Sequence, residues 1–207
     1  MNGQAAQPTE DAIREAWDAS DFRKAATLAL RLYHSEILSF LVWRLHNPND
    51  GQEAFSMLAE DLWSGMPSFE WRCSLRTWLY VLARNAASRL KASPHKRFEH
   101  RLSDNAGEHL AEVLDAVRTQ TQAYRRTDMK QRVRSLRDSL SPDDQLLLVL
   151  RVDRGLSWRD SVLAIHGDTE LDDELLKRES ARLRQCFQRI KRELRRMAVE
   201  QGISERN

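Results

Sequence analysis

Apolar residues recur every three or four positions along much of the chain, the spacing that places side chains on one face of a helix. The longest such stretch predicts a helix from Asp21 to about His46. Its apolar stripe contains Phe22, Ala26, Ala29, Tyr33, Ile37, Phe40, Leu41 and Leu45. The sequence HNPND then predicts a break, because proline and asparagine favour helix boundaries. Residues 51–64 and 74–91 predict two more helices, separated by the turn MPSF.

We interpret residues 21–92 as one helical domain, preceded by an N-terminal extension, residues 1–20, in which Thr9 caps a short helix. Residues 93–128 are mostly polar and poorly periodic, so they predict a linker. A second helical domain is predicted over 129–200, followed by a tail, residues 201–207.

Capping boxes divide the second domain into helices. A serine or threonine followed three residues later by an acid predicts helix starts at Ser141, Ser157 and Thr169. Gly155 and Gly167 predict the ends of the first two helices, and the last is expected to run through residue 200. No stretch predicts a strand. The expected fold class is therefore all-α, with two small helical domains joined by a linker.

The composition suits compact helical modules, since 41% of the 207 residues are apolar and 31% are charged. The two cysteines, Cys73 and Cys186, are far apart and favour reduced thiols. A signal-peptide pattern is lacking, as is an apolar run of the roughly 20 residues that a membrane span needs, so we expect a cytoplasmic protein without a membrane partner. Motifs for nucleotide binding, nucleophilic catalysis and metal binding are also lacking. We therefore expect no enzymatic activity and no cofactor.

Aromatic and basic residues alternate in the stretch FEWRCSLRTWLYVLARNAASRLKA, residues 69–92. The residues expected on one outer face of its helix, where they could contact a phosphate backbone, are Arg76, Tyr80, Arg84 and Lys91. Trp71 and Arg72 precede the helix in a turn, where a ring beside an arginine suits capture of an unpaired base. Phe69 and Trp78 are predicted core residues. The alternative is that the arginines form only a solvated face.

Positive charge is concentrated in the last predicted helix. Residues 177–197 contain nine lysines and arginines but two glutamates, while Leu183, Phe187, Ile190 and Leu194 keep an apolar stripe. A helix pair with a basic second helix is the arrangement that enters a DNA major groove, although a basic helix can also be a solvated or partner-binding surface. Five acids precede it, at Asp168, Glu170, Asp172, Asp173 and Glu174. These would repel phosphate, so DNA contacts are expected from Arg182 onward.

Both halves together resemble an extracytoplasmic-function (ECF) sigma factor of bacterial RNA polymerase. The stretch LWSGMPSFEWRCSLRTWLYVLARNAASRL resembles region two of that family, with its TWLY followed by A-R-N. The stretches SLSPDDQLLLVLRVDRGLSWRDSVLAIHG and LRQCFQRIKRELRR resemble region four, with its helix-turn-helix and basic final helix. The N-terminal extension and the linker stay unmatched.

The resemblance implies core RNA polymerase and promoter DNA as partners. Region two of the family opens the minus-ten element and holds a flipped base in the loop before TWLY, which corresponds here to residues 68–74, with Trp71 and Arg72 as base contacts. Region four reads the minus-thirty-five element. The residues that this implies here are Arg182, Arg184, Gln185, Gln188, Arg189 and Arg192. An anti-sigma factor is a further implied partner.

The stretch that binds polymerase in the family is usually acidic, near D-A-E-D-L-V-Q-E, whereas the aligned residues here are DGQEAFSM. Asp50 and Glu53 keep their acids, but Ser56 takes the place of an acid or amide. Some relatives that lack these acids resemble switches completed by a Ser/Thr kinase, so phosphorylation of Ser56 is a hypothesis, with simple solvent exposure as its alternative. The turn before the last helix is also longer than in the family, which affects the register of that helix.

Two other functions stay open from the sequence. The chain could be a sigma-like protein-interaction adaptor that has lost its polymerase or promoter contacts. It could instead be a stand-alone helix-turn-helix transcription regulator.

Overall fold

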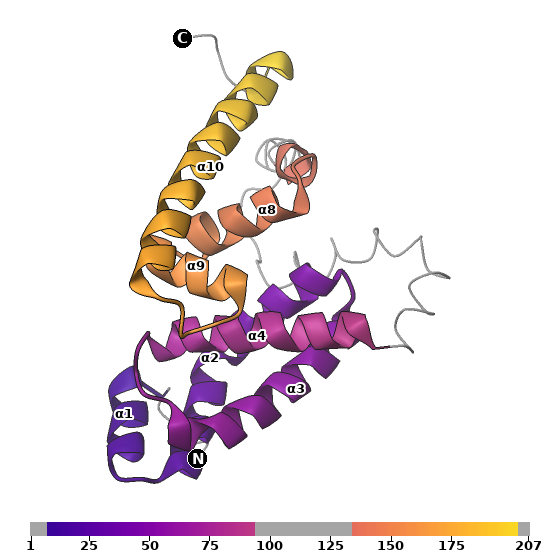
Figure 1. Cartoon of the computed structure of the whole chain (residues 1–207). Coiled ribbons are helices and arrows are strands. Elements are labelled where there is room, and N and C mark those ends of the chain that lie inside the picture. Colours follow the sequence, from indigo (N-terminus) through magenta and orange to yellow (C-terminus); the bar gives the residue numbers. More distant parts are fainter. Residues whose placement is uncertain (1–7, 94–133, 203–207) are drawn as a thin grey trace. The chain divides into compact units, whose positions relative to one another are not determined.

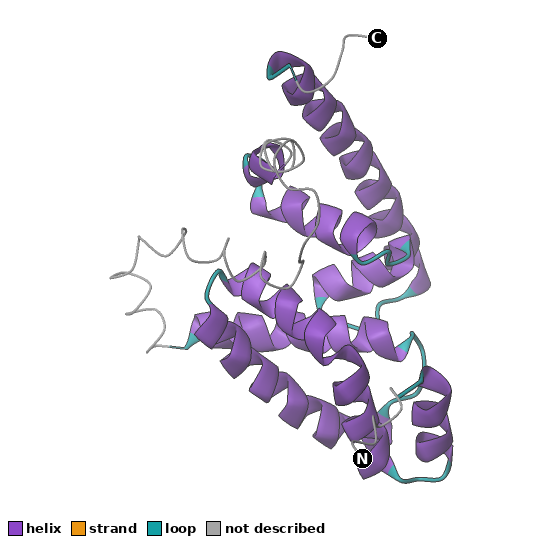
Figure 2. Cartoon of the chain, turned by 180° about the vertical axis from the view of Figure 1, so that it is seen from behind, coloured by secondary structure: helices purple, strands orange, loops and turns teal. Residues whose placement is uncertain are grey.

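The computed structural model describes residues 8–93 and 134–202, which are helices joined by turns and loops, without a strand (Figures 1 and 2). The chain divides into two compact units. The predicted linker lies outside the described residues except for Ser93, as do the start of the predicted second domain, residues 129–133, and most of the tail. Within the described residues, no helix combines the length and the apolarity that a membrane crossing requires.

Within residues 8–93, the first unit contains four α-helices and a short 3-10 helix, and residues 164–169, at the end of α9 (Trp158–His166), also group with it (Figure 1). These are α1 (Glu10–Asp18), α2 (Phe22–Leu45), α3 (Pro48–Gly65), η1 (Met66–Ser68) and α4 (Leu75–Ala92). Local signals set their ends: the side chains of Thr9, Asp21, Asn47 and Ser74 each accept a hydrogen bond from a backbone N–H in the first turn of the following helix. The predicted helices are thus confirmed, with α3 longer at its start than expected.

The core of the first unit lies where α2, α3 and α4 pack together. The apolar stripe predicted on α2 is buried apart from Phe22, which is half-buried. Gly51 lets α3 approach α2 closely, because a Cβ at that position would lie 2.5 Å from Cγ2 of Val42. Phe69 and Trp78 stack with ring centroids 4.4 Å apart, which confirms their predicted place in the core.

Helix α1 also belongs to this core, although the sequence suggested only an extension. Ile13 is fully buried and Ala16 nearly so. The indole Nε1 of Trp17 donates a hydrogen bond to the carbonyl oxygen of Met66 at 3.0 Å. Residues 10–18 are therefore a packed helix of the first unit, because their apolar side chains meet partners about 50 residues away that a local pattern cannot reveal.

The second unit is built around the long helix α10 (Asp173–Glu200). It also contains α8 (Pro142–Leu148), the π-helical turn η2 (Val149–Asp153) and the start of α9 (Trp158–His166). Leu176 and Ile190 of α10 are buried, as are Leu146–Leu150 of α8 and η2. The sequence predicted one continuous helix here, and the widened turn η2 is the part that it did not reveal.

The helix ends between residues 141 and 173 follow the predicted signals with one exception. Ser141 and Ser157 accept hydrogen bonds from the N–H groups of Asp144 and Asp160, and Gly155 and Gly167 adopt left-handed backbone conformations (φ +66° and +74°). The prediction that Thr169 caps the last helix is wrong.

Asp172 is the actual cap of α10. Its carboxylate accepts a hydrogen bond from the N–H of Leu175 at 2.8 Å, so the helix begins three residues later than expected. A short carboxylate suits an N-cap as well as a threonine does, and the local sequence offered both.

Candidate nucleic-acid interface

Helix α10 presents a continuous exposed face of basic and amide side chains. The residues that the sequence analysis assigned to major-groove contact are all exposed: Arg182, Arg184, Gln185, Gln188, Arg189 and Arg192. The opposite face carries Leu176, Ser180 and Ile190 into the unit. This separation follows from the three- and four-residue spacing of the apolar positions, which leaves the remaining side chains in solvent.

Two residues of this face have ion-pair partners within their own unit. Arg189 forms an ion pair with Asp144 of α8 at 2.6 Å, and Arg182 lies 3.3 Å from Glu179. In the described part of the chain, Gln185, Gln188 and Arg192 have no side-chain hydrogen-bond or ion-pair partner. Their donors are therefore available to a ligand without breaking a contact of the protein.

The ring of Trp158, at the start of α9, contacts side chains in the middle of α10. The guanidinium carbon of Arg151 lies 4.1 Å from the ring centroid and that of Arg184 lies 5.8 Å from it. Phe187 meets the same ring edge-on at 5.6 Å. Side chains from η2 and from α10 thus surround this indole, and the indole in turn limits where Arg184 can lie.

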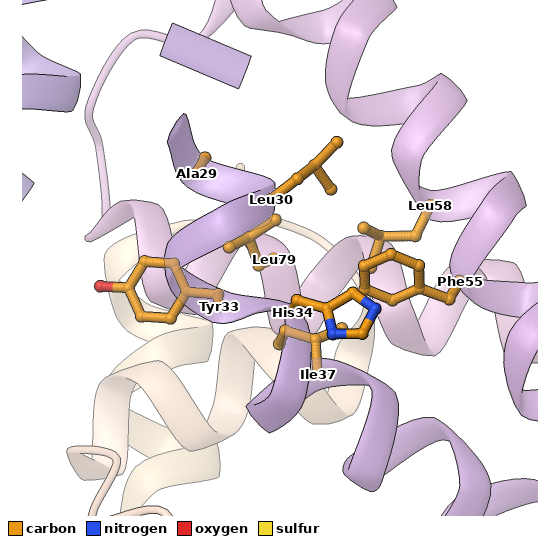
Figure 3. A pocket seen from close by; sticks show the side chains of 8 residues that line it. All are labelled: Ala29, Leu30, Tyr33, His34, Ile37, Phe55, Leu58 and Leu79. Carbon is orange, nitrogen blue, oxygen red and sulfur yellow. The ribbon is translucent and has the colours of Figure 1, made fainter. Parts of the chain in front are cut away.

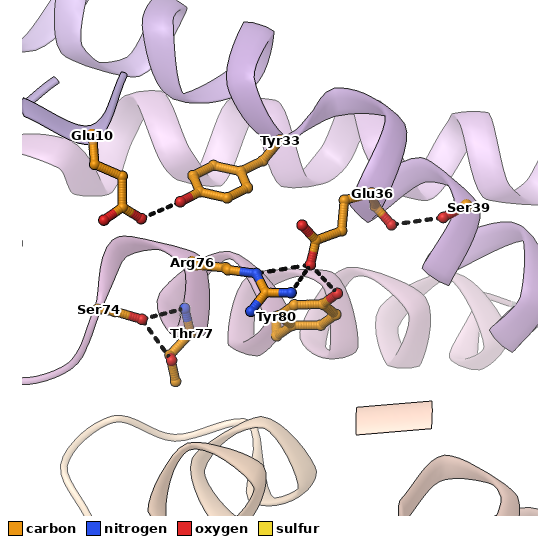
Figure 4. A network of polar contacts seen from close by, with 8 residues as sticks. All are labelled: Glu10, Tyr33, Glu36, Ser39, Ser74, Arg76, Thr77 and Tyr80. Carbon is orange, nitrogen blue, oxygen red and sulfur yellow. Dashed lines mark hydrogen bonds and ion pairs between the residues drawn. The ribbon is translucent and has the colours of Figure 1, made fainter. Parts of the chain in front are cut away.

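The face predicted on α4 is not a continuous outer surface. The hydroxyl of Tyr80 donates to Glu36 Oε1 at 2.6 Å, and Nε and a terminal nitrogen of Arg76 donate to the same oxygen at 2.9 and 2.6 Å (Figure 4). The ring of Tyr80 packs edge-on against Phe40 and is fully buried. The prediction that Tyr80 faces outward is wrong, because Glu36, 44 residues earlier, supplies a polar partner inside the bundle.

Arg76 is held in its charged form by this contact. Partial burial disfavours the charge, but the hydrogen bonds and the attraction of Glu36 outweigh burial and raise the guanidinium pKa above its ordinary value. A DNA phosphate would have to compete with that carboxylate. Arg76 is therefore a structural residue of the first unit rather than an open cation.

Of the remaining predicted residues of α4, Arg84 is half-buried and Lys91 is exposed near the end of the helix. The ammonium of Lys91 donates to the carbonyl oxygen of Arg44 at 3.4 Å. Partial burial of its ammonium group and the neighbouring charge of Arg44 lower the pKa of Lys91.

The turn before α4 holds Trp71 in a cluster of rings. Trp71 lies 4.9 Å from Phe69 and 5.8 Å from Trp17, measured between centroids, and its ring is half-buried. Arg72 is exposed, and its Nε donates to Glu70 at 2.8 Å. The turn thus brings Trp71 and Arg72 near the surface as expected, but with a neighbour, α1, that the sequence did not place there.

The residues predicted to contact polymerase lie on the first half of α3. Glu53 and Ser56 are exposed and one turn apart, so they share a face, while Asp50 is half-buried in the first turn. The hydroxyl of Ser56 donates to the carbonyl oxygen of Gln52 at 3.2 Å. An exposed hydroxyl at this place is sterically accessible to a modifying enzyme.

A hollow between α2 and α3 is too tight to hold a small molecule. It is lined by apolar side chains and by His34, whose ring meets Phe55 edge-on at 4.9 Å (Figure 3). Its interior has no room for a water molecule. Within residues 8–93 and 134–202, no cluster of His, Cys, Asp or Glu side chains has the arrangement of a metal site.

Four residues of these surfaces were missed by sequence reasoning: Arg14, Trp17, Glu36 and Arg151. Each acts through a partner in another helix or turn. The one available signal was composition, since Arg14 and Trp17 repeat the arginine-and-tryptophan pairing that drew attention to residues 69–92. Comparison of the chain with models of known protein families and with curated protein sequences finds no match.

Proposed function

We propose that the chain is a promoter-specificity factor of the ECF sigma type, which binds core RNA polymerase, directs it to promoters and assists DNA melting. The second unit would read the minus-thirty-five element with α10, and the turn at Trp71 would hold an unpaired base of the minus-ten element. The protein itself would make and break no covalent bond.

The exposed face of α10 is the observation that carries this proposal. All six residues that the family resemblance assigned to base or phosphate contact are exposed on one helix. That helix follows α9 through a turn, which is the order of a helix-turn-helix. Arginine and glutamine can form paired hydrogen bonds with purine edges, so the face has suitable chemistry for reading sequence.

Contact with polymerase is proposed for the face of α3 that carries Glu53 and Ser56. A phosphate on Ser56 would add a charge of roughly −1.5 to −2 and restore the acidity that the family shows there. A Ser/Thr kinase and an anti-sigma factor are therefore partners to test. If phosphomimetic Ser56→Asp leaves polymerase affinity unchanged, the phosphorylation hypothesis is lost.

The contact of Arg76 and Tyr80 with Glu36 favours a second candidate, a sigma-like protein-interaction adaptor. Two of the expected minus-ten contacts are engaged within the first unit, which leaves fewer groups there for DNA. A stand-alone helix-turn-helix regulator is the third candidate, since the second unit alone could bind a duplex.

Run-off transcription with purified core RNA polymerase and a randomised promoter library separates these functions. A promoter-specificity factor selects two short sequence elements and yields transcripts that start at a fixed distance from them. An adaptor gives no promoter-selected transcripts, whether or not it has kept its contact with polymerase. A stand-alone regulator binds duplex DNA and does not co-purify with polymerase.

A further inference from the structure

Helix α1 covers the ring of Trp71. The guanidinium carbon of Arg14 lies 4.3 Å from the centroid of the Trp71 ring, and Trp17 meets that ring edge-on at 87°. Arg14 is also 3.2 Å from Asp18, one helical turn further along α1. An arginine over an indole takes the place that a stacked base would take, because both are flat groups attracted to the ring face.

The covered arrangement leaves one polar group unsatisfied. The indole Nε1 of Trp71 is buried and donates to no acceptor in the described part of the chain. Trp71 also has a φ of +57°, a left-handed conformation that bulky residues rarely adopt. A buried donor without an acceptor and a strained backbone both disfavour the closed state, so an alternative arrangement with an acceptor for the N–H would be favoured.

We infer that the seam between α1 and the turn at residues 69–74 is a binding site for one unpaired nucleobase, which Arg14 occupies in the unliganded protein. A base entering the site displaces the guanidinium and stacks on the face of the Trp71 ring in its place. This inference rests on the proposed capture of a base by Trp71, and it adds Arg14 and Trp17 of α1 to that site.

If Arg14 competes with the base, its removal should change DNA affinity in the opposite direction to the removal of an ordinary phosphate-binding arginine. Removing an arginine usually weakens binding to a polyanion, because one phosphate contact is lost. Removing Arg14 would instead strengthen the part of binding that depends on the base, since the competitor for the ring is gone. The phosphate-dependent part would change little or would weaken.

The test measures binding of the full-length chain to two fluorescent single strands, oligo-dT and an abasic oligomer of equal length, by anisotropy. Their affinity ratio isolates the contribution of the base. Arg14→Ala is expected to raise this ratio about three- to tenfold, from the usual strength of an arginine–indole contact. Arg23→Ala is the matched control, because Arg23 lies over another indole, Trp63, at 5.6 Å. It should leave the ratio unchanged.

Trp71→Ala separates failure of this inference from failure of the proposed base capture. If Trp71→Ala leaves the ratio as in the wild type, base capture by Trp71 is wrong, and the inference falls with it. If Trp71→Ala lowers the ratio but Arg14→Ala does not raise it, base capture stands and the role of α1 is overturned. Equal weakening of both oligomers by Arg14→Ala would likewise show a phosphate contact and overturn the inference.

Discussion

One carboxylate oxygen of Glu36 accepts hydrogen bonds from both Arg76 and Tyr80, so a single side chain ties α2 to α4 (Figure 4). The side chains of Glu36 and Arg76 are 22% and 29% exposed, which is buried enough for water to screen the pair only partly. The cluster therefore stabilises the first unit rather than serving as a surface for a ligand.

Glu36→Ala should lower the free energy of unfolding by about 1.5–3 kcal/mol, because it removes charge-assisted hydrogen bonds and leaves Arg76 without its carboxylate. Urea denaturation followed by circular dichroism measures the loss. Glu70→Ala is the control, since it breaks the pair with Arg72, whose side chains are 64% and 55% exposed, and should cost less than about 1 kcal/mol. Equal costs for the two variants would contradict the structural role of Glu36.

Tyr33 gives the first unit a pH dependence at alkaline pH. Its hydroxyl donates to Glu10 of α1, and burial, followed by the hydrogen bond and the charge of Glu10, raises its pKa. A phenol whose pKa is raised by folding contributes stability that is complete below its unfolded pKa of about 10 and is lost as pH rises above that value. Unfolding free energy should therefore fall steadily as the pH rises above about 10.

The measurement is urea denaturation at several pH values in wild type and in Tyr33→Phe. The variant lacks the ionisable hydroxyl, so its curve should be flatter in the alkaline range. It should also be less stable than the wild type at neutral pH, by about 0.5–1.5 kcal/mol for one lost hydrogen bond. If the unfolding free energy of Tyr33→Phe falls with pH as steeply as that of the wild type, another group causes the alkaline loss of stability.

At the scale of the element, α10 carries basic residues with unequal roles. Arg184 lies against the ring of Trp158, which restricts its position, whereas Arg196 pairs with Glu193 and Glu200 at 2.6 and 2.7 Å on an exposed surface. A restricted guanidinium loses less entropy when it binds a base edge. An arginine near the end of the helix is placed to contact phosphate, where sequence is not read.

Arg184→Ala should therefore relax base preference, with a cost of about 1–3 kcal/mol at the preferred site. Arg196→Ala should weaken all duplexes alike and reduce the slope of log affinity against log salt by about one. Titration of a preferred and a scrambled duplex at several salt concentrations gives both quantities. Identical effects of the two substitutions would contradict the assigned register of α10.

The helices were predictable from sequence because their ends depend on local chemistry. The caps at Thr9 and Ser141 each act on a backbone N–H three residues away. One error, at Thr169, arose where two local caps compete, and the errors at Tyr80 and α1 arose where partners are distant. Tyr80 was predicted on the outer face because no nearby residue reveals its partner Glu36, and the contact of Trp71 with α1 was missed because α1 lies more than 50 residues earlier in the chain. The widened turn η2 has no local signature in its apolar sequence.

At the scale of the whole molecule, the secondary structure of the described residues is all helical, and the chain divides into two compact units whose bounds differ from the predicted domains, because residues 164–169 group with the first unit. The assignment of functions to them stays a prediction. The spacing of apolar residues along α10 explains why its basic face is exposed. Whether that face binds a DNA groove or a protein is decided by contacts with the partner.

If the first unit assists melting and the second reads the upstream element, substitutions in the two units should affect transcription independently. Trp71→Ala would impair opening, and Arg184→Ala would impair recognition of the upstream element. The two residues belong to different units and share no contact partner, so their free-energy effects should add to within about 0.3–0.5 kcal/mol.

Run-off transcription with wild type, both single variants and the double variant measures this additivity on one promoter. The same set on a promoter with a scrambled upstream element is the control. There Arg184→Ala should have no further effect, because its base contact is already lost, while Trp71→Ala should keep its full effect. If Arg184→Ala were equally harmful on both promoters, α10 would be reading no sequence, and an adaptor or general DNA-binding role would account better for its charge.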